Sequence, residues 1–298
     1  MGDERKIFDP NNFIDRKAEQ EIFQKLIQCQ DDARLLTICD DGGRGKSHLL
    51  KQLQYNCIWQ FGISVAMIEL QALEDPTDFH LVKRTRDELV QVSPQLKFTV
   101  FDNADQERLQ AVPIQIIGGV DLRDAEVSGT GNRFAGVQIE NFVLPPQSSQ
   151  VSDKEMKARE KCVSAFFDDI RQICNTEKVV ILFDTWDKCN SRLQGIILNF
   201  LRLLCFNTNT RPAYLIFVLA GRKKGFPPFT EMLGANYHNI VRSIESFGEW
   251  DEDHVRAFLQ VNGYEQIRDA VIQFICSEIK AGMTLIDALT VAKVSPRQ

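Results

Sequence analysis

Residues 35–53, LLTICDDGGRGKSHLLKQL, constrain the possible folds of this chain more than any other stretch. The apolar run at 35–39 predicts a buried strand, and the leucines at helical spacing after Ser47 predict a helix. Between them lies a glycine-rich turn, in which backbone N–H groups can surround phosphate oxygens. The start of the helix adds unpaired N–H donors and the positive end of its dipole. This order of strand, loop and helix predicts a phosphate-binding loop.

The loop contains most of the residues that we expect to bind a nucleotide. Lys46 is expected to act in catalysis by reaching the β- and γ-phosphates, and the Ser47 hydroxyl is expected to bind Mg²⁺. The consensus G-x-x-x-x-G-K-[ST] has a glycine where this chain has Asp40, whose carboxylate either repels phosphate or turns away from it. A chance glycine-rich loop in an ordinary α/β domain is the alternative interpretation of the stretch. The loop residues expected to bind the nucleotide are Asp41, Gly42, Gly43, Arg44, Gly45, Lys46, Ser47 and His48.

The remaining apolar patterns predict alternating strands and helices. Further strands are expected at 64–70, 179–184, 212–222 and 239–244, and helices at 75–92, 152–174 and 191–205. Strands that alternate with helices in this way are typical of a parallel sheet covered on both faces. The sequence therefore predicts an α/β fold, with a three-layer parallel-sheet P-loop NTPase core.

The chain divides into two predicted domains. Residues 1–246 are expected to form the NTPase domain, and residues 247–298, which carry amphipathic helical patterns, a small helical lid domain. Alternating segments such as QLKFTVFD (95–102), followed by glycine and asparagine turns, predict a β-rich insertion at about 95–148. This insertion is either purely structural or a surface that contacts a partner.

Charged residues follow two of the predicted central strands. Asp184 ends one of them, where a carboxylate that holds magnesium together with Ser47 belongs, and Asp187 can polarise the attacking water. Arg222 ends the other strand and can neutralise charge that develops on the γ-phosphate. Ligands of parallel sheets bind at the carboxyl ends of the strands, so we expect these side chains and Lys46 to form one catalytic site.

Composition narrows the class of function. The net charge of −6 and the pI near 5.4 argue against broad nucleic-acid binding, although a local basic cluster such as Lys83, Arg84 and Arg86 stays possible. No apolar run reaches the roughly 20 residues that span a bilayer, and the charged start MGDERKIFD lacks the features of a secretory signal. The eight cysteines form no C-x-x-C pair, so we expect reduced core thiols and a cytoplasmic location.

Several segments resemble the STAND class of P-loop ATPases, the AAA+-related group that includes NACHT and NB-ARC proteins. FIDRKAE resembles the segment before the first helix of that class, ICDDGGRGKS its phosphate loop, VVILFDTWDK its acidic strand, and LIFVLAGRK the strand with the sensor arginine. SIESFGEWDEDHVRAFLQVNG is similar to the entry of its lid. The resemblance implies that Ile14 and Arg16 flank the adenine. It also implies slow hydrolysis with Asp187 as the water-activating acid, because Thr185 stands where the general AAA+ pattern has Glu.

The resemblance implies an ATP-driven molecular switch that binds ATP or ADP with Mg²⁺. In such proteins the nucleotide closes the lid, ATP-bound subunits form homo-oligomers, and a partner protein is controlled or recruited. No repeat sensor or attached effector follows the lid in these 298 residues. We therefore expect either that the chain is a fragment, or that its effector or sensor is a separate protein. No membrane contact is expected. The alternatives are a nucleotide-binding scaffold that does not hydrolyse and an AAA+ ATPase that acts on nucleic acid. A kinase or transferase is a third, for which the sequence offers no substrate signature.

Overall fold

The computed structural model describes residues 16–30, 32–73, 77–111, 153–248, 250–261, 264, 267–281, 283 and 285–292. The strands are β1 (Leu35–Cys39), β2 (Ser64–Glu69), β3 (Val179–Asp184), β4 (Leu215–Gly221) and β5 (Val241–Ile244). Within the described residues these five strands form one sheet in the order β2-β3-β4-β1-β5. Every neighbouring pair is parallel, so all strands end at the same edge of the sheet.

Helices connect the strands. The α-helices are α1 (Lys17–Ile27), α2 (Lys46–Tyr55), α3 (Asp78–Val92), α4 (Thr99–Ala111), α5 (Asp153–Ile173), α6 (Ser191–Leu201), α7 (Phe229–Leu233), α8 (Tyr237–Ile240), α9 (Glu252–Val261), α10 (Asp269–Lys280) and α11 (Leu285–Val291). Short 3-10 or π-helical turns are η2 (Asn56–Gln60), η3 (Leu70–Ala72), η4 (Trp186–Lys188), η5 (Arg202–Phe206) and η6 (Gly234–Asn236). In the part of the chain that the structure describes, no helix combines the length and apolar character needed to cross a membrane.

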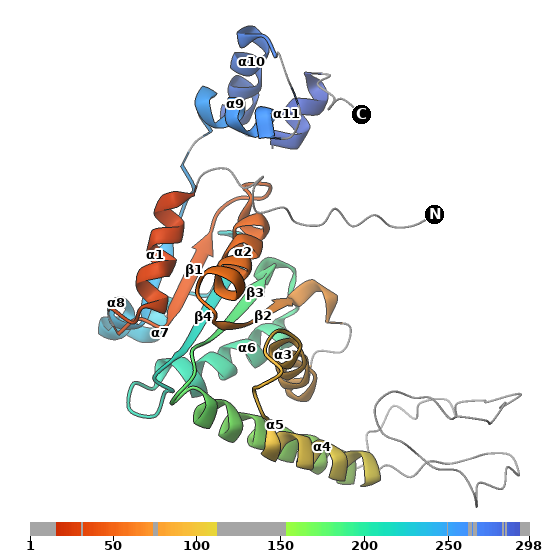
Figure 1. Cartoon of the computed structure of the whole chain (residues 1–298). Helices are drawn as coiled ribbons and strands as arrows, with labels where there is room; N and C mark the ends of the chain where they lie inside the picture. Colours follow the sequence, from red (N-terminus) through yellow and green to blue (C-terminus); the bar gives the residue numbers. More distant parts are fainter. Residues whose placement is uncertain are drawn as a thin grey trace, which may run out of the picture.

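Helices cover both faces of the sheet because its central strands are apolar on both sides. β3 is buried along its whole length, and its residues alternate between two hydrophobic clusters. Val180 and Leu182 pack with residues of α1 and α2, whereas Ile181 and Phe183 pack with residues of α3, α5 and α6. Strands that are apolar without interruption are typical of parallel sheets between two helical layers. The predicted three-layer α/β fold is confirmed (Figure 1).

One segment that was expected to be extended is helical. The strand predicted over 95–102 is wrong, because most of these residues lead into or form the first turn of α4. Phe98 stacks on Phe166 of α5, with ring centroids 5.6 Å apart. The Asp169 carboxylate of α5 accepts the backbone N–H of Phe101 at 2.8 Å, so it satisfies a donor that the start of a helix leaves unpaired. A distant aromatic ring and a distant carboxylate thus stabilise a helix that the local alternation does not indicate.

Three C-terminal helices, α9, α10 and α11, pack around a hydrophobic cluster of their own, which includes Val255, Ile275 and Leu289. We call these helices the lid. Figure 1 shows them beyond one end of the sheet, connected to β5 through residues 245–251. The domain boundary at residue 247 stays a prediction. The remainder of the predicted insertion, residues 112–148, lies outside the described residues.

Candidate nucleotide-binding site

The phosphate loop follows β1, an internal strand that lies between β4 and the edge strand β5. Gly43 and Gly45 have φ values of 74° and 88°, a left-handed conformation that glycine adopts without steric cost. Gly45 is the N-cap of α2, so the first N–H groups of this helix lie at the loop. Leu49, Leu50 and Leu53 hold α2 against the sheet. The backbone donors and the dipole of α2 together favour an anion at this position.

Lys46 lies inside the loop. Its Nζ donates to the main-chain oxygen of Asp40 at 2.7 Å and to that of Asp41 at 2.6 Å. Partial burial of the ammonium lowers the pKa of Lys46, while the carboxylates of Asp40 and Asp187 act in the opposite direction. A phosphate bound in the loop would favour the charged ammonium and offer it stronger acceptors than the two carbonyls.

The Asp40 carboxylate is directed toward the segment that enters the lid. Its side chain is only 5% exposed. Oδ1 accepts the backbone N–H of Asp41 at 2.7 Å, and Oδ2 accepts the backbone N–H of Phe247 at 2.8 Å. Of the two alternatives that the sequence leaves open, the structure supports the one in which this carboxylate turns away from the phosphates.

Arg16 contacts the same segment from the start of α1. Its guanidinium carbon lies 4.2 Å from the centroid of the Phe247 ring, and its Nη1 donates to the Gly248 main-chain oxygen at 3.5 Å. The phosphate loop, α1 and the entry of the lid are therefore connected through Phe247 and Gly248. Adenine binding by Arg16 stays a prediction, and Ile14, the other residue expected at the adenine, lies outside the described residues.

Arg222 and Asp187 form an ion pair beside the loop. Arg222 Nε lies 3.2 Å from Asp187 Oδ2, and the Arg222 backbone N–H donates to Asp187 Oδ1 at 3.2 Å. The guanidinium also packs on Gly42, where a Cβ would lie 3.2 Å from Arg222 Cζ. The buried Trp186 anchors the η4 turn that carries Asp187, because its indole N–H donates to the Gly225 oxygen at 2.9 Å. The structure thus brings Asp187, Arg222 and the loop together.

Asp184 ends β3 and is buried, and its Oδ1 accepts the backbone N–H of Thr185 at 2.8 Å. Thr185 has a φ of 62°, and its hydroxyl donates to the Asp184 main-chain oxygen at 2.7 Å. Ser47 is partly buried in the first turn of α2, and His48 is exposed. A serine hydroxyl and a carboxylate are the oxygen donors that Mg²⁺ takes beside nucleotide phosphates, so Ser47 and Asp184 fit this metal. Among the described residues, no group of three or more His, Cys, Asp or Glu side chains is placed to hold a metal ion.

Sequence reasoning missed one acidic residue at this edge of the sheet, Glu69. It ends β2, and the strand register pairs it with Asp184 of β3. The sequence signal was the same as for Asp184, an acid that follows an apolar run. Glu69 was not recognised as a strand end, because the apolar pattern SVAMIEL continues one residue further, to Leu70.

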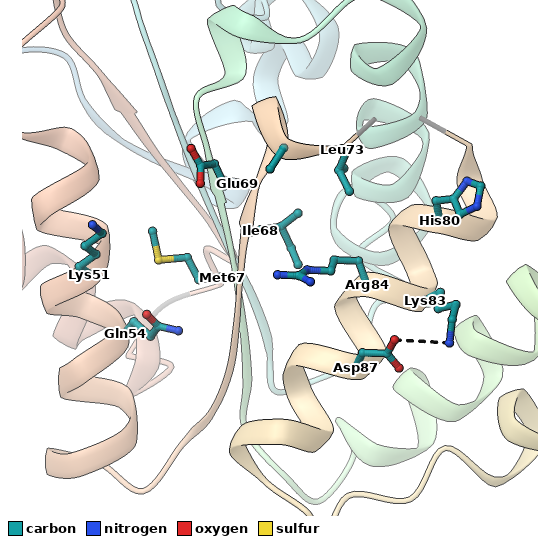
Figure 2. Close-up of a pocket in the computed structure, with 11 residues that line it drawn as sticks. Lys51, Gln54, Met67, Ile68, Glu69, Leu73, His80, Lys83, Arg84 and Asp87 are labelled. Carbon is teal, nitrogen blue, oxygen red and sulfur yellow. Dashed lines mark ion pairs between the residues drawn. The ribbon is translucent and has the colours of Figure 1, made fainter. Parts of the chain in front are cut away.

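Two cavities lie near these residues. The lid residues Trp250, Ile279, Met283 and Leu285 face loop residues 41–44 across a cavity of about 70 Å³. Typical ligand pockets have volumes of about 300–1,000 Å³, so this space is smaller than a nucleotide requires. A second cavity, of about 730 Å³, runs along the edge strand β2 between α2 and α3 (Figure 2).

Comparisons with known proteins relate the chain by its fold. No protein-family model matches the sequence, and no curated protein matches it. A solved structure, that of Drosophila ORC bound to DNA, contains a chain that superposes with a TM-score of 0.52 at 12% sequence identity. The alignment covers 96% of this chain and 56% of the ORC chain, so the chain spans little more than half of that neighbour. At 12% identity this likeness shows a shared fold and no more.

Proposed function

We propose that this chain binds ATP at the phosphate loop, hydrolyses it slowly, and uses the resulting movement of its lid to control or recruit a partner protein. The observation that carries the proposal is the convergence of three neighbouring strands. The loop follows β1, Arg222 follows β4 and Asp184 ends β3. In P-loop NTPases a lysine, a carboxylate and an arginine in such positions bind and neutralise the transferred phosphoryl group.

Each residue has a role that its surroundings support. Lys46 exchanges its carbonyl partners for the β- and γ-phosphates, and the N–H groups of residues 42–48 bind further phosphate oxygens. Ser47 and Asp184 hold Mg²⁺, which neutralises charge on the phosphates when bound. Arg222, positioned by Asp187 and packed on the loop, contacts the γ-phosphate.

Movement of the lid follows from the size of the cavity between the lid and the loop. About 70 Å³ does not accommodate a nucleotide, so the lid moves away from residues 41–44 when ATP enters. The hydrogen bond from the Phe247 N–H to the Asp40 carboxylate connects this movement to the loop. ATP and ADP differ at the γ-phosphate, so they stabilise different positions of the lid and expose different surfaces for homo-oligomerisation and for a separate effector or sensor.

A lysine substitution tests the proposal. Lys46→Ala removes the ammonium from the loop, whereas Lys51→Ala removes an exposed lysine from the same helix and is the matched control. Loss of charge-assisted hydrogen bonds should weaken binding of a fluorescent ATP analogue roughly 10- to 100-fold in the Lys46 variant alone, with loss of phosphate release. Light scattering in ADP and in ATP then measures the assembly. Equal affinity of the two variants would contradict the nucleotide site, and equal masses in ADP and ATP would contradict switching by oligomerisation.

One observation favours a second candidate, a nucleotide-binding scaffold that does not hydrolyse. The residue after the β3 carboxylate is Thr185, and a threonine hydroxyl is not a proton acceptor at neutral pH. Such a protein would bind ATP without releasing phosphate. An ATPase acting on nucleic acid has less support, because the basic cluster on α3 is engaged in ion pairs: Lys83 with Asp87 and Asp105, Arg84 with Glu88, and Arg86 with Asp87 and Asp102.

A further inference from the structure

A carboxylate that accepts a proton from the attacking water would accelerate hydrolysis at this site, and two candidates next to β3 are poorly suited to that role. Thr185 has a hydroxyl in place of a carboxylate, and this hydroxyl already donates to the Asp184 main-chain oxygen. Asp187 has both carboxylate oxygens engaged by Arg222, Oδ2 with Nε and Oδ1 with the backbone N–H. Neither oxygen of Asp187 can therefore bind the attacking water without giving up part of its contact with Arg222.

Glu69 is placed beside Asp184 by the register of the sheet. The two residues are paired in the parallel strands β2 and β3, whose backbones lie about 4.8 Å apart. Side chains alternate along a strand, so Asp184 lies on the same face as Leu182, and Glu69 on the same face as Met67. Both apolar residues belong to the cluster formed with α2. Glu69 and Asp184 therefore share the face of the sheet on which the helix of the phosphate loop packs.

The Glu69 carboxylate is also free to bind a water molecule. It is exposed, and among the described residues it makes no ion pair and no side-chain hydrogen bond. Figure 2 shows Glu69 at the carboxyl end of β2, on the same side of the strand as α2. It lies at one end of the 730 Å³ cavity, which is open to solvent, so water reaches this carboxylate directly.

We infer that Glu69 is the residue that activates the attacking water, the role that the sequence assigns to Asp187. This inference rests on the proposed function. The water oxygen forms a bond to the γ-phosphorus, and the bond from that phosphorus to the β–γ bridging oxygen breaks. ADP leaves with the bonding electron pair, and the proton of the water passes to the Glu69 carboxylate and then to solvent. Asp187 remains a positioning residue for Arg222.

Glu69→Gln tests the inference, because it keeps the size and hydrogen-bonding capacity of the side chain but removes the proton acceptor. Single-turnover phosphate release with excess protein, measured from pH 5 to pH 9 in Mg²⁺, should be at least about 100-fold slower than in the wild type. The affinity for ADP should stay within about threefold, since Glu69 is not expected to bind the nucleotide. Glu69→Asp should restore part of the rate of phosphate release. It should also restore a pH profile in which the rate rises as a carboxyl group loses its proton.

Asp87→Asn is the matched control, because Asp87 lines the same cavity on α3 and pairs with Lys83 at 3.4 Å. It should leave turnover unchanged. If the wild type hydrolyses ATP and Glu69→Gln is equally fast, the inference fails while the proposed function stands. If the wild type binds ATP without releasing phosphate, both the role of Glu69 and the hydrolytic part of the proposed function fail. Absence of nucleotide binding, with no effect of Lys46→Ala, would overturn the site itself.

Discussion

Replacing Asp40 by glycine restores the phosphate-loop consensus, yet the structure predicts that it destabilises the protein. The buried carboxylate accepts two backbone N–H groups, those of Asp41 and Phe247, at 2.7 and 2.8 Å. Hydrogen bonds to charged groups each contribute about 1.5–3 kcal/mol, and the Phe247 N–H would be left without its acceptor. Removal of the carboxylate also removes the cost of burying it, so we expect a net loss of about 2–4 kcal/mol.

The measurement is the free energy of unfolding by denaturant titration, supported by thermal melting and amide exchange. A loss of this size lowers the melting temperature by roughly 3–6 °C in a protein of this length. The Phe247 amide should exchange faster in Asp40→Gly than in the wild type, because it loses its acceptor. Asp41→Gly is the matched control, since it makes the same chemical change at the next residue of the loop, where the side chain is exposed. We expect it to change stability by less than about 1 kcal/mol.

Nucleotide affinity separates this explanation from electrostatic repulsion. If the Asp40 carboxylate faced the phosphates, Asp40→Gly would tighten ATP binding clearly and leave the stability of the empty protein unchanged. The contacts with Asp41 and Phe247 predict the opposite pattern, a loss of stability without tighter binding. A stable variant with tighter ATP binding would therefore refute the structural role of this carboxylate.

Two further predictions concern the phosphate contacts. The pKa of Lys46 is lowered by burial in the empty site and is raised by bound phosphate, so binding takes up a proton between these two pKa values. At a pH below both pKa values, Lys46 is protonated with and without ATP, so the affinity for ATP should be constant. The affinity should fall as the pH rises through the lowered pKa of the empty site. Lys46→Arg should give a flat profile in the same titration, because arginine stays protonated. Gly42→Ala places a methyl group 3.2 Å from Arg222 Cζ, and it should weaken ATP binding about 10-fold while ADP binding stays unchanged. Gly195→Ala is the control, because its Cβ meets no atom within 4 Å, and it should change neither affinity.

Much of the fold follows from local sequence patterns. The apolar runs at β1, β2, β3 and β4 are long enough to indicate strands, and the glycines and helical leucines around them indicate where α2 begins. The errors arise where distant residues decide the local conformation. α4 depends on Asp169, whose carboxylate accepts the Phe101 N–H from 68 residues away. The expected strand at 239–244 begins only at Val241, because the preceding residues form α8.

The candidate site was predictable to a similar extent and for the same physical reason. The loop and the strand-end residues Asp184 and Arg222 are recognisable, since their chemistry lies within a few residues of an apolar run. The partner of the Asp40 carboxylate was not, because Phe247 lies 207 residues further along the chain. The pairing of Glu69 with Asp184 could not be predicted from the sequence either, because it depends on β2 lying next to β3 and on the register of these two strands.

Two departures from the motifs of the ATPase class that the sequence resembles have structural counterparts in this chain. The loop gains a carboxylate at Asp40, and that carboxylate contacts the entry of the lid through Phe247. The strand β3 lacks a glutamate after Asp184, but the adjacent strand β2 ends in Glu69 at the paired position. A substitution at one motif position therefore gives little information on activity until the side chains that the fold brings beside it are known. For the same reason, a double substitution is more informative than either single one. If Glu69 performs the role of the missing glutamate, Thr185→Glu introduced into Glu69→Gln should restore phosphate release, since it returns a carboxylate to the same edge of the sheet.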